Sequence, residues 1–236
     1  MAYLSAVLIT KNEENNIPDC LASLSLADEI VVLDTGSQDN TVMLCQSLGA
    51  KVYLQDKWEG FGKAKQRAVE YATHDWILSI DADERLSPEL QEELKSLKDR
   101  DFEGKAWHLR RRSYYLGKPI RFCGWQSDAP LRIFHRQQGG FNDKAVHEGI
   151  KVTQDQSTCK HWLYHLTYPT LKSHYDKIRF YADLAGKNEA SVPIAGLLAL
   201  YKFLKMYIFK LGFLDGWHGF LLCKNSAWGI WVKYRR

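Results

Sequence analysis

The chain has 236 residues, of which 45% are hydrophobic and 25% charged, a balance that suits one large folded domain, with or without an appendage, and excludes a disordered chain. Its five cysteines are an odd number without a Cys-x-x-Cys pair, which argues against a disulfide scaffold or a cysteine-rich zinc site and favours a reduced, cytoplasmic compartment. The opening residues, MAYLSAVLITKNEE, lack a basic region and a cleavage site, so we expect no secretory signal.

Charge is distributed unevenly along the chain. Residues 1–100 contain 10 Lys and Arg against 18 Asp and Glu, whereas residues 101–236 contain 22 against 10. The acidic part therefore suits a bound cation, and the basic part suits contact with anions.

Apolar, strand-like runs alternate with helical patterns over the first hundred residues. Ser87 and Pro88 mark the strongest helix start, because Ser is a favoured cap and Pro fits the first helical position. The expected strands are 3–9, 29–34, 51–56 and 75–81, and the expected helices are 16–25, 41–50, 62–73 and 87–97.

This alternation predicts right-handed β-α-β units, and therefore an α/β fold whose sheet is mostly parallel in its N-terminal half. Ligands of such sheets bind at the carboxyl ends of the strands. Three expected strands end in polar residues, at 10–13, 34–37 and 81–83, so we expect these groups to meet in one crevice. Further along, the strand-like runs 106–117 and 130–136 follow each other without a helix, which predicts that the sheet becomes mixed.

The tail, residues 194–236, is basic and rich in aromatic residues. A spanning helix needs ~20 largely uncharged residues, and three lysines interrupt 194–214. We therefore expect an amphipathic helical tail that lies in a membrane interface, where Lys and Trp are favoured together. The alternative is a C-terminal helix that packs on the domain core. The basic residues of the tail are Lys202, Lys205, Lys210, Lys224, Lys233, Arg235 and Arg236.

Asp81 and Asp83 stand in the run SIDADERLS, directly after the fourth expected strand. If the strand continues to Asp83, both carboxylates face the same side. Carboxylate oxygens suit Mg²⁺ or Mn²⁺, particularly where substrate phosphates complete the coordination. The structural alternative is a solvated acidic turn, but the position after a fully apolar strand favours the metal interpretation.

Asp34 ends the second expected strand before a Gly-Ser turn. It either starts that turn or accepts hydrogen bonds from a nucleobase or sugar. Lys63, Lys65 and Arg67 begin the third expected helix, either as a solvated basic face or as partners of phosphate or base. The run GFGKAK is neither a Walker loop nor a complete G-x-G-x-x-G motif, so it supports no claim of that kind.

Two runs, AVLITKNEENNIPDCLASLSLADEIVVLDTGSQDNT and GFGKAKQRAVEYATHDWILSIDADERLS, carry these strand-end motifs in an order that resembles the family 2 glycosyltransferases with a GT-A fold. Within that family the chain looks like the bacterial lipopolysaccharide core β-1,4-glucosyltransferases. The resemblance is strong over residues 3–97 and continues more loosely through GWQSDAPLRIFHR and KAVHEGIKV to about residue 152.

The resemblance implies a role for each matching residue at the edge of the sheet. Thr10 and Glu13 would line the nucleotide pocket, and Asp34 would contact the uridine part of the donor. Lys65 would lie near the base. These four residues would bind a UDP-sugar.

Asp81 and Asp83 match the Asp-x-Asp motif of the family, which holds the ribose and the diphosphate-bound Mg²⁺ or Mn²⁺. Transfer with inversion also needs a base on the acceptor hydroxyl. Glu148, in AVHEGI, is the candidate base, and His147 beside it is a rival base or a ligand of diphosphate or metal; the alternative for both is an exposed strand pair. Many relatives have a Glu-Asp pair here, which this chain lacks, and the Gln-x-x-Arg-Trp motif of processive synthases is absent, which favours addition of a single sugar.

The expected function is a metal-dependent, inverting transfer of a sugar from a UDP-sugar to the heptose region of lipid A-core or a similar lipid-linked saccharide. The resemblance favours glucose as this sugar. Residues 1–100 would bind the nucleotide sugar and residues 101–190 the acceptor. Residues 191–236 would hold the protein on the cytoplasmic face of the inner membrane. We expect no nucleic acid among its partners.

Other classes of protein fit less well. A phosphatase of the haloacid dehalogenase class has its Asp-x-Asp after the first strand, whereas here it follows the fourth. A sugar-phosphate nucleotidyltransferase usually has a Gly-rich basic loop after strand one, where this chain has TKNEENN. A non-enzymatic membrane or nucleic-acid adaptor would explain the basic tail but not the polar clusters at three strand ends.

Overall fold

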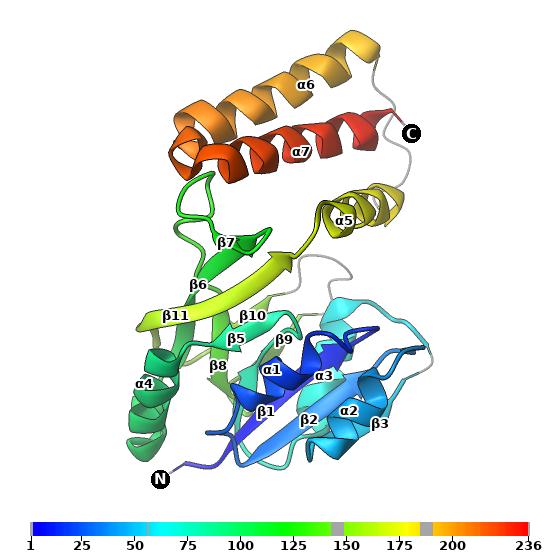
Figure 1. The fold of residues 1–236 in the computed structure, drawn as a ribbon. Coiled ribbons are helices and arrows are strands. Elements are labelled where there is room, and N and C mark those ends of the chain that lie inside the picture. The colour runs from blue at the N-terminus through cyan, green and yellow to red at the C-terminus, as the bar shows by residue number, and fades with distance from the viewer. Residues whose placement is uncertain (1, 56, 143–148, 185–190, 236) are drawn as a thin grey trace. The chain divides into compact units, whose positions relative to one another are not determined.

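The computed structural model describes residues 2–55, 57–142, 149–184 and 191–235 (Figure 1). The chain forms two compact units. The first unit comprises Met1–Arg111 and Ala129–Tyr164, and the second comprises Arg112–Asp128 and His165–Arg236. The chain passes between them three times, twice within a strand.

Four parallel strands form one half of the sheet in the first unit. Their order is β3-β2-β1-β4, and a helix follows each of the first three along the chain, which confirms the predicted β-α-β alternation. The first helix stops at Ala22, because turn-type hydrogen bonds take over at Ser23 and Leu24. The strands are β1 (Leu4–Thr10), β2 (Glu29–Asp34), β3 (Lys51–Leu54) and β4 (Trp76–Ser79), and the helices are α1 (Ile17–Ala22), α2 (Thr41–Ser47) and α3 (Phe61–Tyr71).

The sheet becomes mixed beyond β4, as the missing helices predict. β8 (Leu131–His135) lies antiparallel to β4, and β6 (Ala106–Tyr115) lies antiparallel to β8. β11 (Gln156–Tyr168) and the short β5 (Glu84–Leu86) continue the sheet. The remaining strands are β7 (Lys118–Pro119), which pairs with β6, and β9 (Gly139–Phe141) and β10 (Ile150–Val152), which form a separate two-stranded sheet.

Side chains alternate across β1, so the sheet has a hydrophobic core on each face. Leu4 and Leu8 pack in one core with α1, α2 and α4 (Pro88–Asp99). Val7 packs on the opposite face with Ala68 of α3, whose small side chain lets the helix approach the sheet closely. Helices thus cover both faces of this sheet.

The fourth helix, α4, begins where the sequence predicts. Ser87 Oγ accepts a hydrogen bond from the N–H group of Leu90 at 3.1 Å, and Pro88 occupies the first turn. Leu90, Leu94 and Leu97 are buried at the spacing of one helix face. Capping and packing therefore agree on the position of this helix.

The tail belongs to the second unit and forms a helical hairpin, where a single amphipathic helix was expected. The helices α6 (Val192–Leu204) and α7 (Gly216–Tyr234) lie side by side (Figure 1), and α5 (Leu171–Leu184) packs against α7. Leu211 and Gly216 have left-handed φ angles of 56° and 61°, which break the helix and reverse the chain.

The backbone packs closely at this reversal, and hydrogen bonds connect the reversal to a loop of the same unit. A Cβ atom at Gly219 would lie 2.0 Å from the carbonyl oxygen of Gly212, so this position requires glycine. Asp215 accepts hydrogen bonds from the backbone N–H groups of Arg121 and Phe122 at 3.0 and 2.8 Å. The small core of this unit consists of Tyr115, Ile120, Cys123, Met206, Leu222 and Cys223.

Glu29, at the start of β2, joins three segments of the first unit. Its carboxylate accepts hydrogen bonds from the Ser5 hydroxyl at 2.6 Å, from Lys51 Nζ at 2.6 Å and from the N–H group of Thr73 at 2.8 Å. Burial by itself raises the pKa of Glu29, but the hydrogen bonds lower it more, from 4.5 to about 2. The resulting stabilisation is present above pH 4.5 and is lost as the pH falls toward 2.

We predict that Glu29→Gln lowers the free energy of unfolding by about 3 kcal/mol at neutral pH, because the amide cannot replace the charged acceptor. The difference from the wild type shrinks as the pH falls below 4.5. Urea titrations followed by circular dichroism at pH 7, 4 and 3 measure both effects. Glu70→Gln, exposed on α3, is the control and changes stability by less than ~0.5 kcal/mol. A difference that stays constant over this pH range would contradict the assignment.

Candidate active site

The carboxyl ends of β1 and β2 bring Thr10 and Asp34 together. The two residues are direct partners in the parallel register, and Thr10 Oγ1 donates a hydrogen bond to Asp34 Oδ2 at 3.0 Å. Both residues are buried. Two residues predicted to line one pocket therefore lie in contact at the predicted edge of the sheet.

Asp34 also organises the turn after β2. Its carboxylate accepts hydrogen bonds from the N–H groups of Gly36 and Ser37 at 3.0 and 2.8 Å, and from the Ser37 hydroxyl at 2.5 Å. The turn-building role considered for Asp34 is therefore realised. A nucleotide that donates a hydrogen bond to Asp34 has to share the carboxylate with Ser37 and Thr10 or displace one of them.

Hydrogen bonds join the loop after β1 to the loop after β2. Asn12, with a left-handed φ of 57°, accepts a hydrogen bond from the N–H group of Gln38 at 2.8 Å. The N–H group of Glu13 donates to the Thr41 hydroxyl at 2.7 Å, and its carboxylate accepts from Asn16 at 2.8 Å. Glu13, the third residue predicted for the pocket, is therefore held at the same edge.

Asp81 and Asp83 lie on a turn and not on a continued strand. β4 ends at Ser79, and the N–H group of Glu84 donates to the carbonyl of Asp81 at 2.9 Å. The Glu84 side chain returns to this turn and accepts a hydrogen bond from the N–H group of Asp81 at 3.0 Å. Asp81 and Asp83 are therefore held by a turn, and the alternation of a strand does not apply to them.

Asp81 lies at the centre of a cluster of opposite charges. Its Oδ1 is 2.8 Å from Lys65 Nζ, and its Oδ2 is 2.7 Å from Arg132 Nη2. The same nitrogen of Arg132 lies 2.5 Å from Glu84 Oε1, and Arg111 Nη1 lies 3.3 Å from that oxygen. Cations from α3, β8 and β6 thus offset the repulsion within the DADE run.

Because the cluster is buried, the charge state of each member depends strongly on the charges of the others. The Glu84 side chain is fully buried, and those of Lys65 and Arg132 are 8% and 6% exposed. Burial by itself raises the pKa of Asp81, but Arg132 and Lys65 lower it more, so that it lies well below the usual range. Burial by itself lowers the pKa of Arg132, and Asp81 and Glu84 raise it above its ordinary value. Asp81 therefore stays ionised at neutral and mildly acidic pH.

Arg85 clamps the turn that presents Asp83. Its Nη1 donates to the carbonyls of Ala82 and Glu84 at 2.7 and 2.8 Å, and its Nη2 donates to the carbonyl of Asn16 at 2.7 Å. Arg85 is itself buried. One arginine thus ties the turn after β4 to the start of α1, which fixes the backbone around the aspartates.

The carboxylates at this edge suit a divalent cation that also binds substrate phosphates. Among the residues that the structure describes, no group of three His, Cys, Asp or Glu side chains could hold a metal by itself. Both oxygens of Asp81 contact cationic side chains, and Asp83 is partly exposed. This donor set suits Mg²⁺ or Mn²⁺ bound through one or two carboxylates together with substrate phosphates.

Two predicted residues lie outside the part of the chain that the structure describes, and some residues of the site were not predicted from the sequence. Glu148 and His147, the candidate base and its rival, lie outside the described residues. The roles of Glu84 and Arg85 were not predicted from the sequence, nor was the pairing of Arg132 with carboxylates. A signal was present, because a charged residue inside an apolar strand, as in LRIFH, predicts a buried partner.

Comparison with known proteins identifies the family. A model described as "Glycosyl transferase family 2" matches residues 5–104. Lipopolysaccharide core biosynthesis glycosyltransferase LpsC of Rhizobium meliloti is 36% identical over an alignment 152 residues long, which covers 62% of this chain and 56% of LpsC. An uncharacterized glycosyltransferase of Rickettsia typhi is 30% identical over an alignment that is 247 positions long with its gaps and covers 94% of this chain and 82% of that protein. The chain thus matches most of the second relative but only a little over half of LpsC.

A solved structure gives the fold. TarS of S. aureus, residues 1–349 in complex with UDP, superposes with a TM-score of 0.51 and covers 91% of this chain and 75% of the TarS chain. At 16% identity this likeness concerns the fold alone. From the matching family model, the relative that spans nearly the whole chain and the shared architecture, it follows that this protein belongs to glycosyltransferase family 2 and has the GT-A fold.

Proposed function

We propose that the protein is a metal-dependent, inverting glycosyltransferase that moves a sugar, most simply glucose, from a UDP-sugar to the heptose region of a lipopolysaccharide core or a similar lipid-linked saccharide. The observation that carries this proposal is the edge where β1, β2 and β4 end. There Thr10 contacts Asp34, and Lys65 and Arg132 keep Asp81 ionised. Such an edge suits a nucleotide diphosphate with its cation.

The relatives support the donor and the acceptor to different degrees. LpsC is named for lipopolysaccharide core biosynthesis, which supports a core saccharide as the acceptor of this chain. TarS, which shares the fold, was solved with UDP, and this agrees with UDP as the nucleotide. The choice of glucose rests on the resemblance of the sequence motifs.

Each residue at the edge has a task in this proposal. Thr10 and Glu13 line the nucleotide pocket, and Asp34 accepts a hydrogen bond from the uridine. Asp81 and Asp83 hold the ribose and Mg²⁺ or Mn²⁺, which when bound supplies positive charge next to the leaving diphosphate. Lys65, which we assign to the region of the base, also keeps Asp81 charged through their contact of 2.8 Å.

The reaction is an in-line displacement at the anomeric carbon of the donor sugar. The acceptor oxygen forms its bond to this carbon while the bond to the phosphate oxygen breaks, so the configuration inverts. The bonding electrons leave with UDP, and the proton of the acceptor hydroxyl passes to a base. We assign this base to Glu148, with His147 as its rival, on the resemblance to the family.

The same proposal places the protein on the cytoplasmic face of the inner membrane, held by the α6–α7 hairpin. Among the described residues, Val192–Phe209 is long and apolar enough to cross a membrane by length and composition, and 11% of it is buried. Phe209 and Trp217 are 76% and 66% exposed, and Lys205 and Lys210 lie on the same surface-exposed stretch. Exposed aromatic residues next to lysines favour a position in the headgroup region over a crossing of the bilayer.

We predict that UDP with Mn²⁺ raises the melting temperature of the wild type by about 5 °C or more at saturating concentration, because only the folded state binds it. Asp83→Asn or EDTA removes most of this shift, while the exposed Asp19→Asn keeps it. A panel of nucleotide sugars, tested by melting and by donor hydrolysis, identifies the donor. If a folded wild type responds to no nucleotide sugar with either Mg²⁺ or Mn²⁺, the proposed function is wrong.

We predict that Arg132→Gln lowers the free energy of unfolding by about 3–5 kcal/mol, because it leaves the buried Glu84 with one cation. It also raises the pKa of Asp81, so the response to UDP and Mn²⁺ weakens between pH 7 and pH 5 in the variant and stays constant in the wild type. Urea unfolding and melting shifts at both pH values measure these effects. Arg100→Gln, an exposed arginine, is the control. Equal pH profiles for variant and wild type would show that Arg132 does not control Asp81.

We predict that the protein sediments with phosphatidylglycerol vesicles and that added salt weakens this binding. Phe209→Ser combined with Trp217→Ser lowers the affinity by about 10-fold or more, because two large apolar side chains no longer insert. Leu54→Ser, which changes a side chain that is 69% exposed on β3, is the matched control and leaves binding unchanged. Binding that is equal for all three proteins would exclude the hairpin as the membrane contact.

A further inference from the structure

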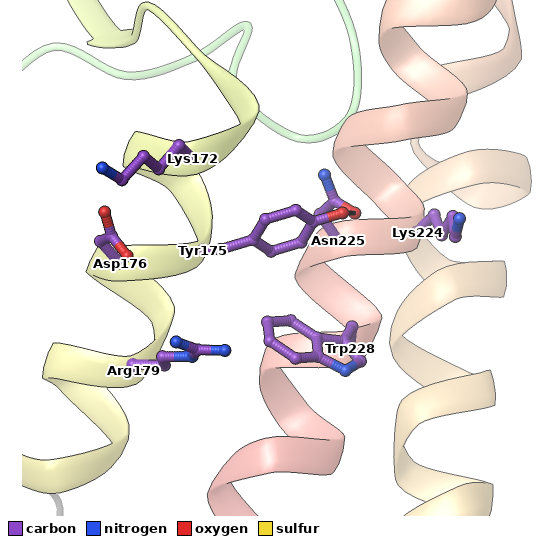
Figure 2. A pocket seen from close by; sticks show the side chains of 7 residues that line it. All are labelled: Lys172, Tyr175, Asp176, Arg179, Lys224, Asn225 and Trp228. Carbon is purple, nitrogen blue, oxygen red and sulfur yellow. Dashed lines mark hydrogen bonds between the residues drawn. The ribbon is translucent and has the colours of Figure 1, made fainter.

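A groove of about 770 Å³ lies between α5 and α7 of the second unit. Figure 2 shows Tyr175 reaching from α5 toward Asn225 of α7, with Arg179 pointing toward Trp228. The volume falls in the range of pockets that hold small organic ligands. The lining residues are Lys172, Tyr175, Asp176, Arg179, Lys224, Asn225 and Trp228.

A chain of hydrogen bonds holds the polar floor of this groove. The Tyr175 hydroxyl donates to Asn225 Oδ1 at 3.3 Å, and Asn225 Nδ2 donates to the Tyr115 hydroxyl at 2.9 Å. The Tyr115 hydroxyl lies 3.1 Å from His174 Nδ1. Burial lowers the pKa of His174 to about 4, so the imidazole is neutral, and its tautomer decides which of the two groups donates. Asn225, which is 2% exposed, is thus fixed in one orientation.

Positive charge dominates the rim of the groove. Lys172, Arg179 and Lys224 line it, against Asp176 as the single acid in the lining. Within the part of the chain that the structure describes, no ion pair or hydrogen bond engages any of the three cations. An anion that enters the groove can therefore bind these cations without breaking an ion pair or hydrogen bond among the described residues.

Two aromatic rings supply the apolar part of the groove. The rings of Tyr175 and Trp228 have centroids 5.1 Å apart and planes at 82°, so they form a corner. Aromatic surface beside fixed hydrogen-bonding groups suits a sugar ring, which has apolar C–H faces and polar hydroxyls. The planar guanidinium of Arg179 suits a phosphate or carboxylate.

We propose that this groove binds an anionic saccharide, with a sugar ring in the corner of Tyr175 and Trp228 and its phosphate or carboxylate at Arg179, while Lys224 adds positive charge to the lining. If the proposed transferase function holds, this ligand is an anionic part of the acceptor. A lipid headgroup offers the same phosphate but no pyranose ring for the aromatic corner. The ring and the buried Asn225 therefore favour the saccharide.

The test uses the full chain labelled with 5-fluorotryptophan, in which Trp228→Phe assigns the ¹⁹F signal of Trp228. Mannose 6-phosphate and galacturonic acid are titrated as probes, with mannose, inorganic phosphate and phosphatidylglycerol vesicles as comparisons. We expect a saturable shift of the Trp228 signal with an anionic sugar, and weaker effects with mannose or phosphate alone. Arg179→Gln combined with Lys224→Gln weakens the binding by about 10-fold or more. Lys118→Gln, an exposed lysine of the same unit, is the control.

Three results would overturn the proposal. The first is no shift of the Trp228 signal with either anionic sugar, and the second is equal binding by the double variant and the wild type. The third is a shift caused by the vesicles and not by the sugars, which would assign the groove to lipid phosphate. The shift in melting temperature of the wild type with UDP and Mn²⁺ is measured in parallel. If this shift is absent, the transferase proposal alone is overturned.

Discussion

The electrostatic compensation of Glu84 is the constraint on which the site depends. A fully buried carboxylate is stable only with cations and hydrogen bonds in reach, and Glu84 obtains them from Arg132, Arg111 and the N–H group of Asp81. Both arginines come from strands that follow Glu84 in the chain and lie antiparallel in the sheet. The mixed half of the sheet is therefore part of the structure that fixes Asp81, and not an addition to a complete parallel half.

The two units are stabilised in different ways. The first unit has a broad sheet with a hydrophobic core on each face, and a cluster of ion pairs around Asp81 and Glu84 holds the turn after β4. The second unit has a small core that includes Met206, Leu222 and Cys223, and it leaves several large apolar side chains exposed on α6 and after it. The surplus of basic residues after residue 100 is consistent with contacts to anionic ligands and surfaces.

The sequence predicted the architecture well where local signals and burial agree. The apolar runs at 29–34 and 75–81 and the cap at Ser87 correspond to β2, β4 and α4. It predicted the tail less well, because left-handed backbone at Leu211 has no sequence signal comparable to a glycine. The partners of Asp81 were not predictable from spacing either, since Arg132 is brought to it by long-range strand pairing. The base remains a prediction, because Glu148 lies outside the described residues.

The bond between Asp215 and the loop at Arg121 and Phe122 has a practical consequence for protein production. Hydrophobic C-terminal tails are often cut away to make a protein easier to purify. Here a chain shortened before residue 191 would lose the carboxylate that accepts from two backbone N–H groups and would uncover Tyr115 and Cys123, which pack against Met206 and Leu222. Detergent or charged substitutions on the outer face of the hairpin are therefore better routes to soluble material than truncation.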